Sequence, residues 1–210
     1  MINLIFLLTY TLTVGQVDLG TGVVSIHFDD KTVVNFFDSP IDLIPKKTLQ
    51  FFEDKSIKSW NIRDIEEHKT WLKPEVLWLD YSSFVFRCVN IKDDWFEVIV
   101  NNEDGSKYWI NRNNITEYKT WETYLKEMFS IARLSNKTQN IRRLPNDNSE
   151  IDEYKGRDCF QVKSMRGDWI EIFTPDYSKD GSYGNETNIS SGWIKWKSGN
   201  DLLIEYHITS

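Results

Sequence analysis

The sequence predicts a mainly β protein made of two small β-barrels in tandem, joined by a short helix. Three observations lead to this prediction: an internal repeat, side chains that alternate in polarity along the repeated segments, and one stretch with helical spacing. Of the 210 residues, 14% are aromatic, which is typical of β-rich modules in which flat side chains cover a small core.

The internal repeat is the strongest pattern in the chain. The segment FRCVNIKDDWFEVIV (86–100) matches FQVKSMRGDWIEIFT (160–174) without a gap and aligns Trp95 with Trp169. Further along, YWI (108–110) matches GWI (192–194), after a connection that is ten residues longer in the second copy. Loops absorb such insertions at little cost, so both copies can share one fold.

The repeat continues upstream. VNFFDSP (34–40) matches QNIRRLP (139–145), and Ser25-Ile26 matches Ser130-Ile131. The first copy is longer between its proline and its hairpin, so we expect an insertion at about residues 41–71. The modules then span about residues 24–115 and 130–208.

The repeated segments have the period of β-strands. In DWFEVIV, Phe96 and Val98 alternate with Trp95 and Glu97, and DWIEIFT follows the same pattern. The tetrapeptides IKDD and MRGD, which precede each tryptophan, are typical of tight turns. Each copy is therefore predicted to hold a hairpin and a third short strand, and several such strands favour a small barrel without exposed edges.

The connection between the copies predicts a helix. In TEYKTWETYLKEMFSI (116–131), Trp121, Tyr124, Leu125 and Met128 recur at helical spacing. We expect a linker helix over residues 116–129.

The first residues are typical of a secretory signal peptide. An apolar run from Ile2 to Val14 is followed by the small residue Gly15 before an expected cut at Gln16. The run is too short for a comfortable helix across a bilayer of roughly 30 Å. We therefore expect a signal peptide at 1–15 and an exported protein, periplasmic or secreted, without a membrane span; a misassigned start or a buried N-terminal strand is the alternative.

The charge of the chain argues against nucleic acid as a partner. The formal net charge is -7 at pH 7, and the 25 Lys and Arg residues are dispersed among 32 acidic ones. Binding to phosphates requires a basic stripe.

The second copy resembles the bacterial SH3-like domain family. NIRRLPNDNSEI, FQVKSMRGDWIEI and GWIKW are similar to its "N-[IV]-R-x-x-P" opening strand, its "G-x-W-x-x-[IV]" hairpin and its closing "G-W-[IV]". The first copy resembles the family more loosely, because Phe37 stands in the place of Arg142, Asp93 in that of Gly167 and Tyr108 in that of Gly192. The whole chain is similar to exported bacterial proteins with two such modules.

The resemblance implies a binding module that recognises a peptidoglycan peptide or an envelope protein through aromatic grooves. Aromatic side chains with a polar group suit this role. The alternative for each of them is that it covers a core or packs between the modules. The candidate ligand-binding residues are Trp169, Trp193, Tyr177, Tyr183, Trp95, Trp109 and Tyr108.

Two other functions remain as alternatives. The chain can be a structural or inhibitory partner protein whose insertion at 41–71 supplies the specific surface. RDCF (157–160) resembles the Asp-Cys start of cell-wall cysteine peptidases, but the 51 residues after Cys159 are too few for a domain that must supply the other catalytic groups, and His207 alone does not complete the site. We therefore predict a protein that is not an enzyme.

No cofactor or metal is predicted. The three histidines are scattered, and the loop from Asp176 to Thr187 lacks the spacing of an EF-hand, although its carboxylates could converge on Ca²⁺. Cys88 and Cys159 could pair in an exported chain, but the strand period turns them toward opposite faces of their copies. The pairing stays open, as does the oligomeric state.

Overall fold

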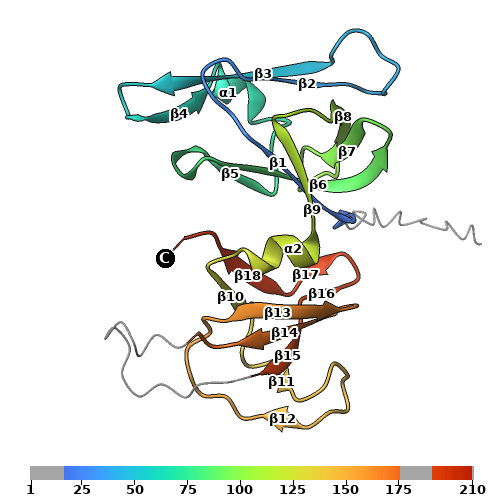
Figure 1. Cartoon of the computed structure of the whole chain (residues 1–210), viewed down its shortest axis with the longest axis vertical. Helices are drawn as coiled ribbons and strands as arrows, with labels where there is room; N and C mark the ends of the chain where they lie inside the picture. Colours follow the sequence, from blue (N-terminus) through green and yellow to red (C-terminus); the bar gives the residue numbers. More distant parts are fainter. Residues whose placement is uncertain (1–16, 176–190, 210) are drawn as a thin grey trace, which may run out of the picture.

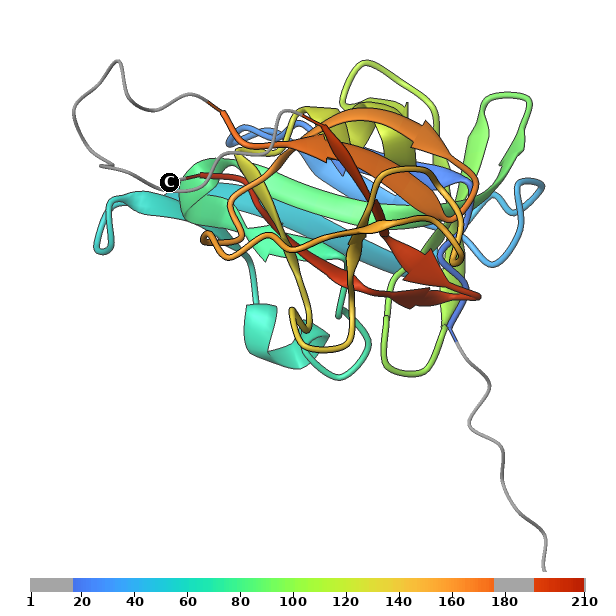
Figure 2. The ribbon, with the colours of Figure 1, turned by 90° about the horizontal axis from the view of Figure 1, so that it is seen from below.

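The computed structural model describes residues 17–175 and 191–209. The predicted signal peptide, Tyr177, Tyr183 and the whole loop from Asp176 to Thr187 lie outside the described residues. The described part is mainly β with short helices, which confirms the coarse prediction of a mainly β fold. It forms two units stacked along the long axis (Figures 1 and 2).

The first unit, here copy one, contains nine strands and two short helical segments before the connecting helix. They are β1 (Gly22–Ile26), β2 (Val33–Phe36), β3 (Lys47–Asp54), β4 (Ser59–Ile62), α1 (Ile65–His68), β5 (Val76–Trp78), the 3-10 helix η1 (Leu79–Tyr81), β6 (Ser83–Lys92), β7 (Trp95–Ile99), β8 (Lys107–Asn111) and β9 (Thr116–Thr120).

The connecting helix α2 (Trp121–Lys126) leads into the second unit, here copy two. Its strands within the described residues are β10 (Ser130–Arg133), β11 (Ile141–Arg142), β12 (Ile151–Asp152), β13 (Gln161–Arg166), β14 (Trp169–Phe173), β15 (Gly192–Lys195), β16 (Lys197–Ser198), β17 (Asp201–Leu202) and β18 (Ile204–His207).

The two copies place their strands in the same order. Copy one follows β3-β2-β8-β7-β6-β1-β9, with β2 joined to β8 by the antiparallel bridge Phe37–Trp109. Copy two follows β12-β11-β15-β14-β13-β10-β18, with β10 joined to the start of β13 by the bridge Ile131–Phe160. The repeat in the sequence is therefore a repeat in the structure.

The repeated hairpins also agree residue by residue. Lys92 lies opposite Trp95 in the β6–β7 hairpin, as Arg166 lies opposite Trp169 in the β13–β14 hairpin. Each hairpin has its register shift at the same point, around Val89 in copy one and Lys163 in copy two. A bulge of this kind turns the strand and fixes which side chains face the core.

The register corrects the predicted alignment at the first strand. Val24 lies opposite Phe86 and Tyr118, whereas Ile131 lies opposite Phe160 and Tyr206. Val24 is thus the counterpart of Ile131, so the match of Ser25-Ile26 with Ser130-Ile131 is wrong by two residues. Short matches between apolar strand residues do not determine register by themselves.

The register also moves the insertion of copy one. Phe36 pairs with Lys47, and its counterpart Ile141 pairs with Asp152. The segments between these pairs, 37–46 and 142–151, have the same length. The extra residues therefore come after Lys47 and form the rest of β3, β4, α1 and β5, rather than beginning at residue 41.

Neither row of strands closes into a barrel through hydrogen bonds. In the part of the chain that the structure describes, no ladder joins β9 to β3 or β4, or β18 to β12. Only the coarser prediction of a mainly β fold with several sheets is confirmed. A closed barrel needs a continuous ladder with a fixed stagger between its first and last strands, and the edges of both sheets here remain open.

The predicted linker helix is shorter than expected. Residues 116–120 form β9, which pairs with β1, and the helix begins only at Trp121. The side chain of Thr120 caps the helix, because its Oγ1 accepts a hydrogen bond from the backbone N–H of Thr123 at 3.2 Å. Residues 116–120 form a strand rather than a helix because β1 supplies hydrogen-bond partners for their backbone.

The buried face of α2 joins the two copies in one hydrophobic core. Trp121, Tyr124 and Leu125 are buried, together with Leu19 and Val23 of copy one. This cluster continues into the core of copy two, which includes Phe160 and Ile170 among others. Val24 and Phe86 belong instead to a separate core within copy one, so β1 is buried on both faces.

A polar contact also crosses between the copies. The Glu75 carboxylate accepts hydrogen bonds from the Tyr206 hydroxyl of copy two and from Arg87 Nε and Asn102 Nδ2 of copy one. Burial and the nearby Glu75 carboxylate raise the pKa of Tyr206 above its usual range, so the phenol remains a donor. The Glu75 side chain is 6% exposed, and its charge is stabilised by these donors.

The two cysteines are not joined by a disulfide. Cys88 is fully buried in the core of copy one, and burial raises the pKa of its thiol to about 12. A thiol with such a pKa is a poor nucleophile.

Candidate functional site

A groove in copy one lies beside Trp95. The cavity has a volume of about 220 Å³. Its lining comes from β2 and the residue after it, from β7 and β8, and from the loop into β9. The residues are Val33, Val34, Asn35, Phe37, Trp95, Ile110, Asn111, Asn113, Ile115 and Thr116.

A groove in copy two lies beside Trp169. The cavity has a volume of about 280 Å³. Its lining comes from the segment before β11, from β11 and the loop after it, from β14 and β15, and from the residue directly before the last strand. The residues are Leu134, Ser135, Thr138, Gln139, Asn140, Arg142, Asp147, Trp169, Lys195 and Leu203.

These two grooves are one site repeated in both copies. The repeat that aligns Trp95 with Trp169 also aligns most of the other lining residues, although they come from separate segments. The corresponding pairs are Val33 and Thr138, Val34 and Gln139, Asn35 and Asn140, Phe37 and Arg142, Trp95 and Trp169, and Asn111 and Lys195.

In copy one the groove is aromatic and uncharged. The rings of Phe37 and Trp95 meet edge to face, with centroids 5.3 Å apart, a favourable arrangement for two aromatic rings. The Asn35 side-chain oxygen accepts a hydrogen bond from the Thr48 hydroxyl at 2.9 Å. This groove therefore offers flat apolar surface with amide groups at its rim.

In copy two the groove combines an aromatic ring with cations. The Lys195 ammonium lies 5.3 Å from the centroid of the Trp169 ring and 2.7 Å from the Asp147 carboxylate. Arg142 donates one hydrogen bond to the carbonyl of Ser149 at 2.7 Å. Lys195 and Arg142 replace Asn111 and Phe37, so the same position has a different charge in the two copies.

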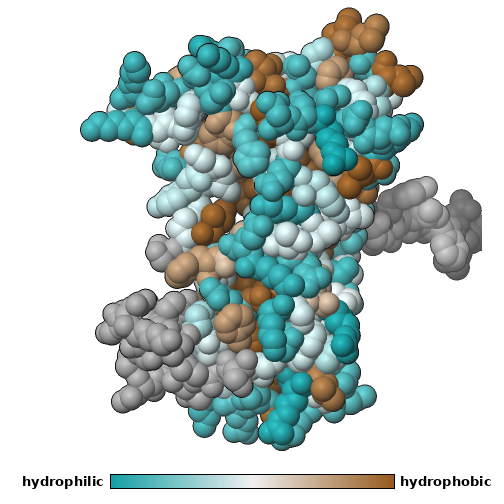
Figure 3. Space-filling model, in the orientation of Figure 1, coloured by the Kyte–Doolittle hydropathy of each residue, from teal (hydrophilic) through white to brown (hydrophobic). Residues whose placement is uncertain are grey.

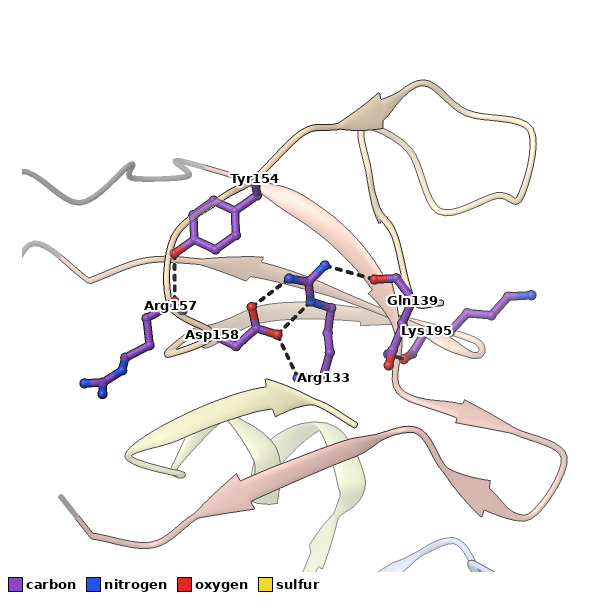
Figure 4. Close-up of polar contacts among 6 residues, drawn as sticks. All are labelled: Arg133, Gln139, Tyr154, Arg157, Asp158 and Lys195. Carbon is purple, nitrogen blue, oxygen red and sulfur yellow. Dashed lines mark hydrogen bonds and ion pairs between the residues drawn. The ribbon is translucent and has the colours of Figure 1, made fainter. Parts of the chain in front are cut away.

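A partly buried network supports the groove of copy two (Figure 4). Arg133 forms two hydrogen bonds of 2.7 Å with the carboxylate of Asp158 and donates a third to the Gln139 carbonyl at 2.9 Å. The side chain of Gln139 in turn donates to the Lys195 carbonyl at 2.5 Å. The Arg133–Asp158 pair thereby fixes Gln139 and the backbone that carries Lys195.

Trp109 and Trp193 lie on the same sheet faces as the groove tryptophans but outside the cavities. Trp109 is opposite Glu97, and Trp193 is opposite Glu171. The guanidinium of Arg166 lies 5.7 Å from the centroid of the Trp193 ring. These rings extend the aromatic surface beside each groove.

Glu171 keeps its negative charge on this face. Hydrogen bonds from Ser191 and Ser164, with a smaller effect of Lys163, lower the pKa of its carboxyl group to about 2. Its counterpart in copy one is Glu97. The anion is held by donors of copy two itself and lies beside Trp193 rather than in the cavity.

Tyr108 lies on the opposite face of the sheet from Trp95 and Trp109. It lies opposite Val98, whose side chain faces the core of copy one, and its ring packs edge to face on Phe36 and Trp71. Its role is therefore packing. Its counterpart is Gly192, so the two copies fill this position differently.

The partners of the groove tryptophans could not be predicted from the sequence. Gln139 and Lys195 come from segments that are far from Trp169 in the chain, so no local pattern indicates that they meet. The alignment of the two copies shows that Phe37 corresponds to Arg142, and the structure places both residues in the lining of their grooves.

The described residues hold no group of three or more His, Cys, Asp or Glu side chains that could bind a metal ion.

The segment RDCF (157–160) lies directly before β13. Phe160 forms a β-bridge with Ile131, and Asp158 forms an ion pair with Arg133. Asp158 thus supports the groove through Arg133.

Comparisons with known proteins give no relative. No family model, no curated protein and no solved structure matches the chain. Among the helices in the described part of the chain, none is long and apolar enough to cross a membrane.

Proposed function

We propose that this chain is an exported binding protein, not an enzyme, in which two SH3-like modules recognise a cell-wall peptide or an envelope protein. The ligand lies in the groove beside Trp169 in copy two, and the groove beside Trp95 in copy one provides a second, weaker site. Extended peptides suit such grooves because aromatic rings bind them at little cost in side-chain entropy.

One observation carries this proposal: the same groove occurs at the same position of both copies. Recurrence at equivalent residues shows that the shared arrangement of strands forms the cavity, rather than one local arrangement of side chains. Here Trp95 and Trp169 line equivalent cavities, although the lining residues come from separate segments of the chain. The fold therefore provides a preformed concave site with an aromatic wall.

The segments that carry the resemblance to SH3-like domains support the assignment of the modules. The three matching segments form β11, the β13–β14 hairpin and β15, which are neighbours in the sheet of copy two. Their counterparts in copy one have the same order, with β2 joined to β8 by the Phe37–Trp109 bridge.

Retention of the protein on purified peptidoglycan tests the proposal. We expect Trp169→Ala to weaken retention by about 10-fold, because a ring that forms the wall of a binding groove typically contributes on the order of 1–2 kcal/mol. Trp193→Ala should weaken it less, because Trp193 lies outside the cavity. Pelleting with peptidoglycan at graded concentrations measures both effects.

Trp78→Ala provides the matched control for this experiment. Trp78 is 42% exposed and contacts Tyr81 outside both grooves, so its removal should leave retention unchanged. Equal retention of the wild type, Trp169→Ala and Trp193→Ala would remove the proposal.

A second function, docking to a partner protein, is favoured by the loop between β2 and β3. Its tip carries Ile41, Leu43 and Ile44, which are 84%, 95% and 82% exposed. Figure 3 shows hydrophobic atoms gathered at this tip. Exposed apolar side chains in one place mark interaction sites.

The equivalent loop of copy two supplies the test of this second function. Its residues at the three positions are Asn146, Asn148 and Ser149. The variant I41N/L43N/I44S should keep the fold and lose co-purification of a partner from the native envelope fraction. Ile57→Asn, another exposed apolar position, is the control; a triple variant that retains its partner contradicts docking through this loop.

A further inference from the structure

The two equivalent grooves differ in charge. None of the residues that line the groove of copy one is Lys, Arg, Asp or Glu. The groove of copy two contains Arg142, Lys195 and Asp147, with a formal sum of one positive charge. The framework is shared, so the difference lies in the side chains and points to different ligands.

Lys195 can exchange its present partner for a ligand. Its ammonium contacts Asp147, whose side chain is 67% exposed, while Lys195 itself is 34% exposed. Pairs of exposed charges contribute little to stability, so a carboxylate of a ligand can compete with Asp147. The ring of Trp169 keeps the ammonium at the groove in either case.

Arg142 supplies further donors. One of its guanidinium nitrogens donates to the Ser149 carbonyl, and a guanidinium group has five N–H donors in total. The geometry of a guanidinium group suits a carboxylate, which it can bind through two parallel hydrogen bonds. Arg142 follows Ile141 on β11, the strand that forms one wall of the groove.

We propose that the groove of copy two binds a carboxylate-bearing end of a peptide, whereas the groove of copy one binds an uncharged apolar segment. This inference rests on the proposed function and adds the ligand class. Lys195 and Arg142 bind the carboxylate, and the Trp169 ring packs against the residue that carries it. Asp147 is displaced from Lys195 toward water when the ligand enters.

Nuclear magnetic resonance of the full chain tests the inference. The probes are N-acetyl-trialanine with a free carboxylate and the same peptide as its carboxamide. The indole N–H signal of Trp169, assigned with Trp169→Phe, should shift in a saturable way with the free carboxylate. We expect binding to be at least ~5-fold weaker for the carboxamide, and the preference should shrink as salt is added.

Exchange of residues between the copies provides matched variants. Lys195→Asn and Arg142→Phe place the residues of copy one in copy two, and they should remove the preference for the carboxylate. The reciprocal change, Asn111→Lys with Phe37→Arg, should give the Trp95 indole signal the response that Trp169 shows in the wild type.

Three results overturn the inference: no saturable shift of Trp169 with the free carboxylate, equal shifts with both peptides, or a preference that survives Lys195→Asn with Arg142→Phe. Retention on peptidoglycan is measured separately. If retention persists without a preference for the carboxylate, the proposed function stands and only the ligand class is wrong.

Discussion

Replacement of Trp121 by alanine is expected to reduce the free energy of unfolding by about 3–5 kcal/mol. Trp121 is 4% exposed, and its ring packs on Tyr124 and on Trp196 at centroid distances of 6.0 and 5.6 Å. Its indole N–H donates to the Leu19 carbonyl at 3.0 Å. The substitution leaves a cavity where the two copies meet and an unsatisfied carbonyl.

Urea denaturation followed by circular dichroism measures this effect. The wild type should unfold in one transition, because a single core runs from copy one through α2 into copy two. Trp78→Ala is the control with the same change in side-chain volume at an exposed site, and it should cost less than about 1 kcal/mol. Similar losses for both variants would contradict the packing role of Trp121.

Replacement of Arg133 by alanine is expected to cost about 3–5 kcal/mol, because it leaves the Asp158 carboxylate without its cation. The Arg133 and Asp158 side chains are only 6% and 14% exposed. The equivalent positions of copy one hold Ile26 and Phe84, both buried and apolar. The fold therefore accepts either a buried ion pair or an apolar pair at this point.

The double variant R133M/D158V separates stability from support of the groove. It removes both charges together and should recover most of the stability lost in Arg133→Ala, because no lone buried charge remains. It also removes the donor to the Gln139 carbonyl, so retention on peptidoglycan should stay weakened. Equal denaturation midpoints for the single and the double variant would show that charge pairing is not the cause of the loss.

The repeat and its hairpins could be predicted from the sequence because they are local. Alternation around Trp95 and Trp169 identified the core faces, and Phe96 and Ile170 are indeed buried. The buried side of the connecting segment, including Trp121 and Leu125, was also visible from its spacing. Side-chain periodicity reports burial reliably when the segment has one buried face.

The limits of the elements could not be predicted in the same way. The polarity of residues 116–120 alternates too weakly to distinguish a strand from a helix. These residues form a strand because they pair with β1. The start of the insertion was obscured because the matched proline lies inside a loop of equal length in both copies, and the pairing of Phe36 with Lys47 places the insertion later. Closure of the sheets likewise depends on long-range pairing.

The composition of the groove was the feature that the sequence predicted least well. Gln139, Trp169 and Lys195 belong to three segments, and their meeting depends on the order of β11, β15 and β14. A motif describes one segment at a time, so it identified Trp169 as a candidate without its cationic partner. The pairing of β14 with β15 supplies that partner, because it places Lys195 opposite Trp169.

The burial of α2 sets a rule for any ligand long enough to reach both grooves. A flexible tether would let two binding modules search for sites at variable separations. Here the connection is part of the shared core, so the two grooves are held at one fixed separation. Under the proposed function, a cell-wall fragment or protein segment whose length matches this separation would bind both grooves and gain avidity, whereas one of another length would bind only one groove.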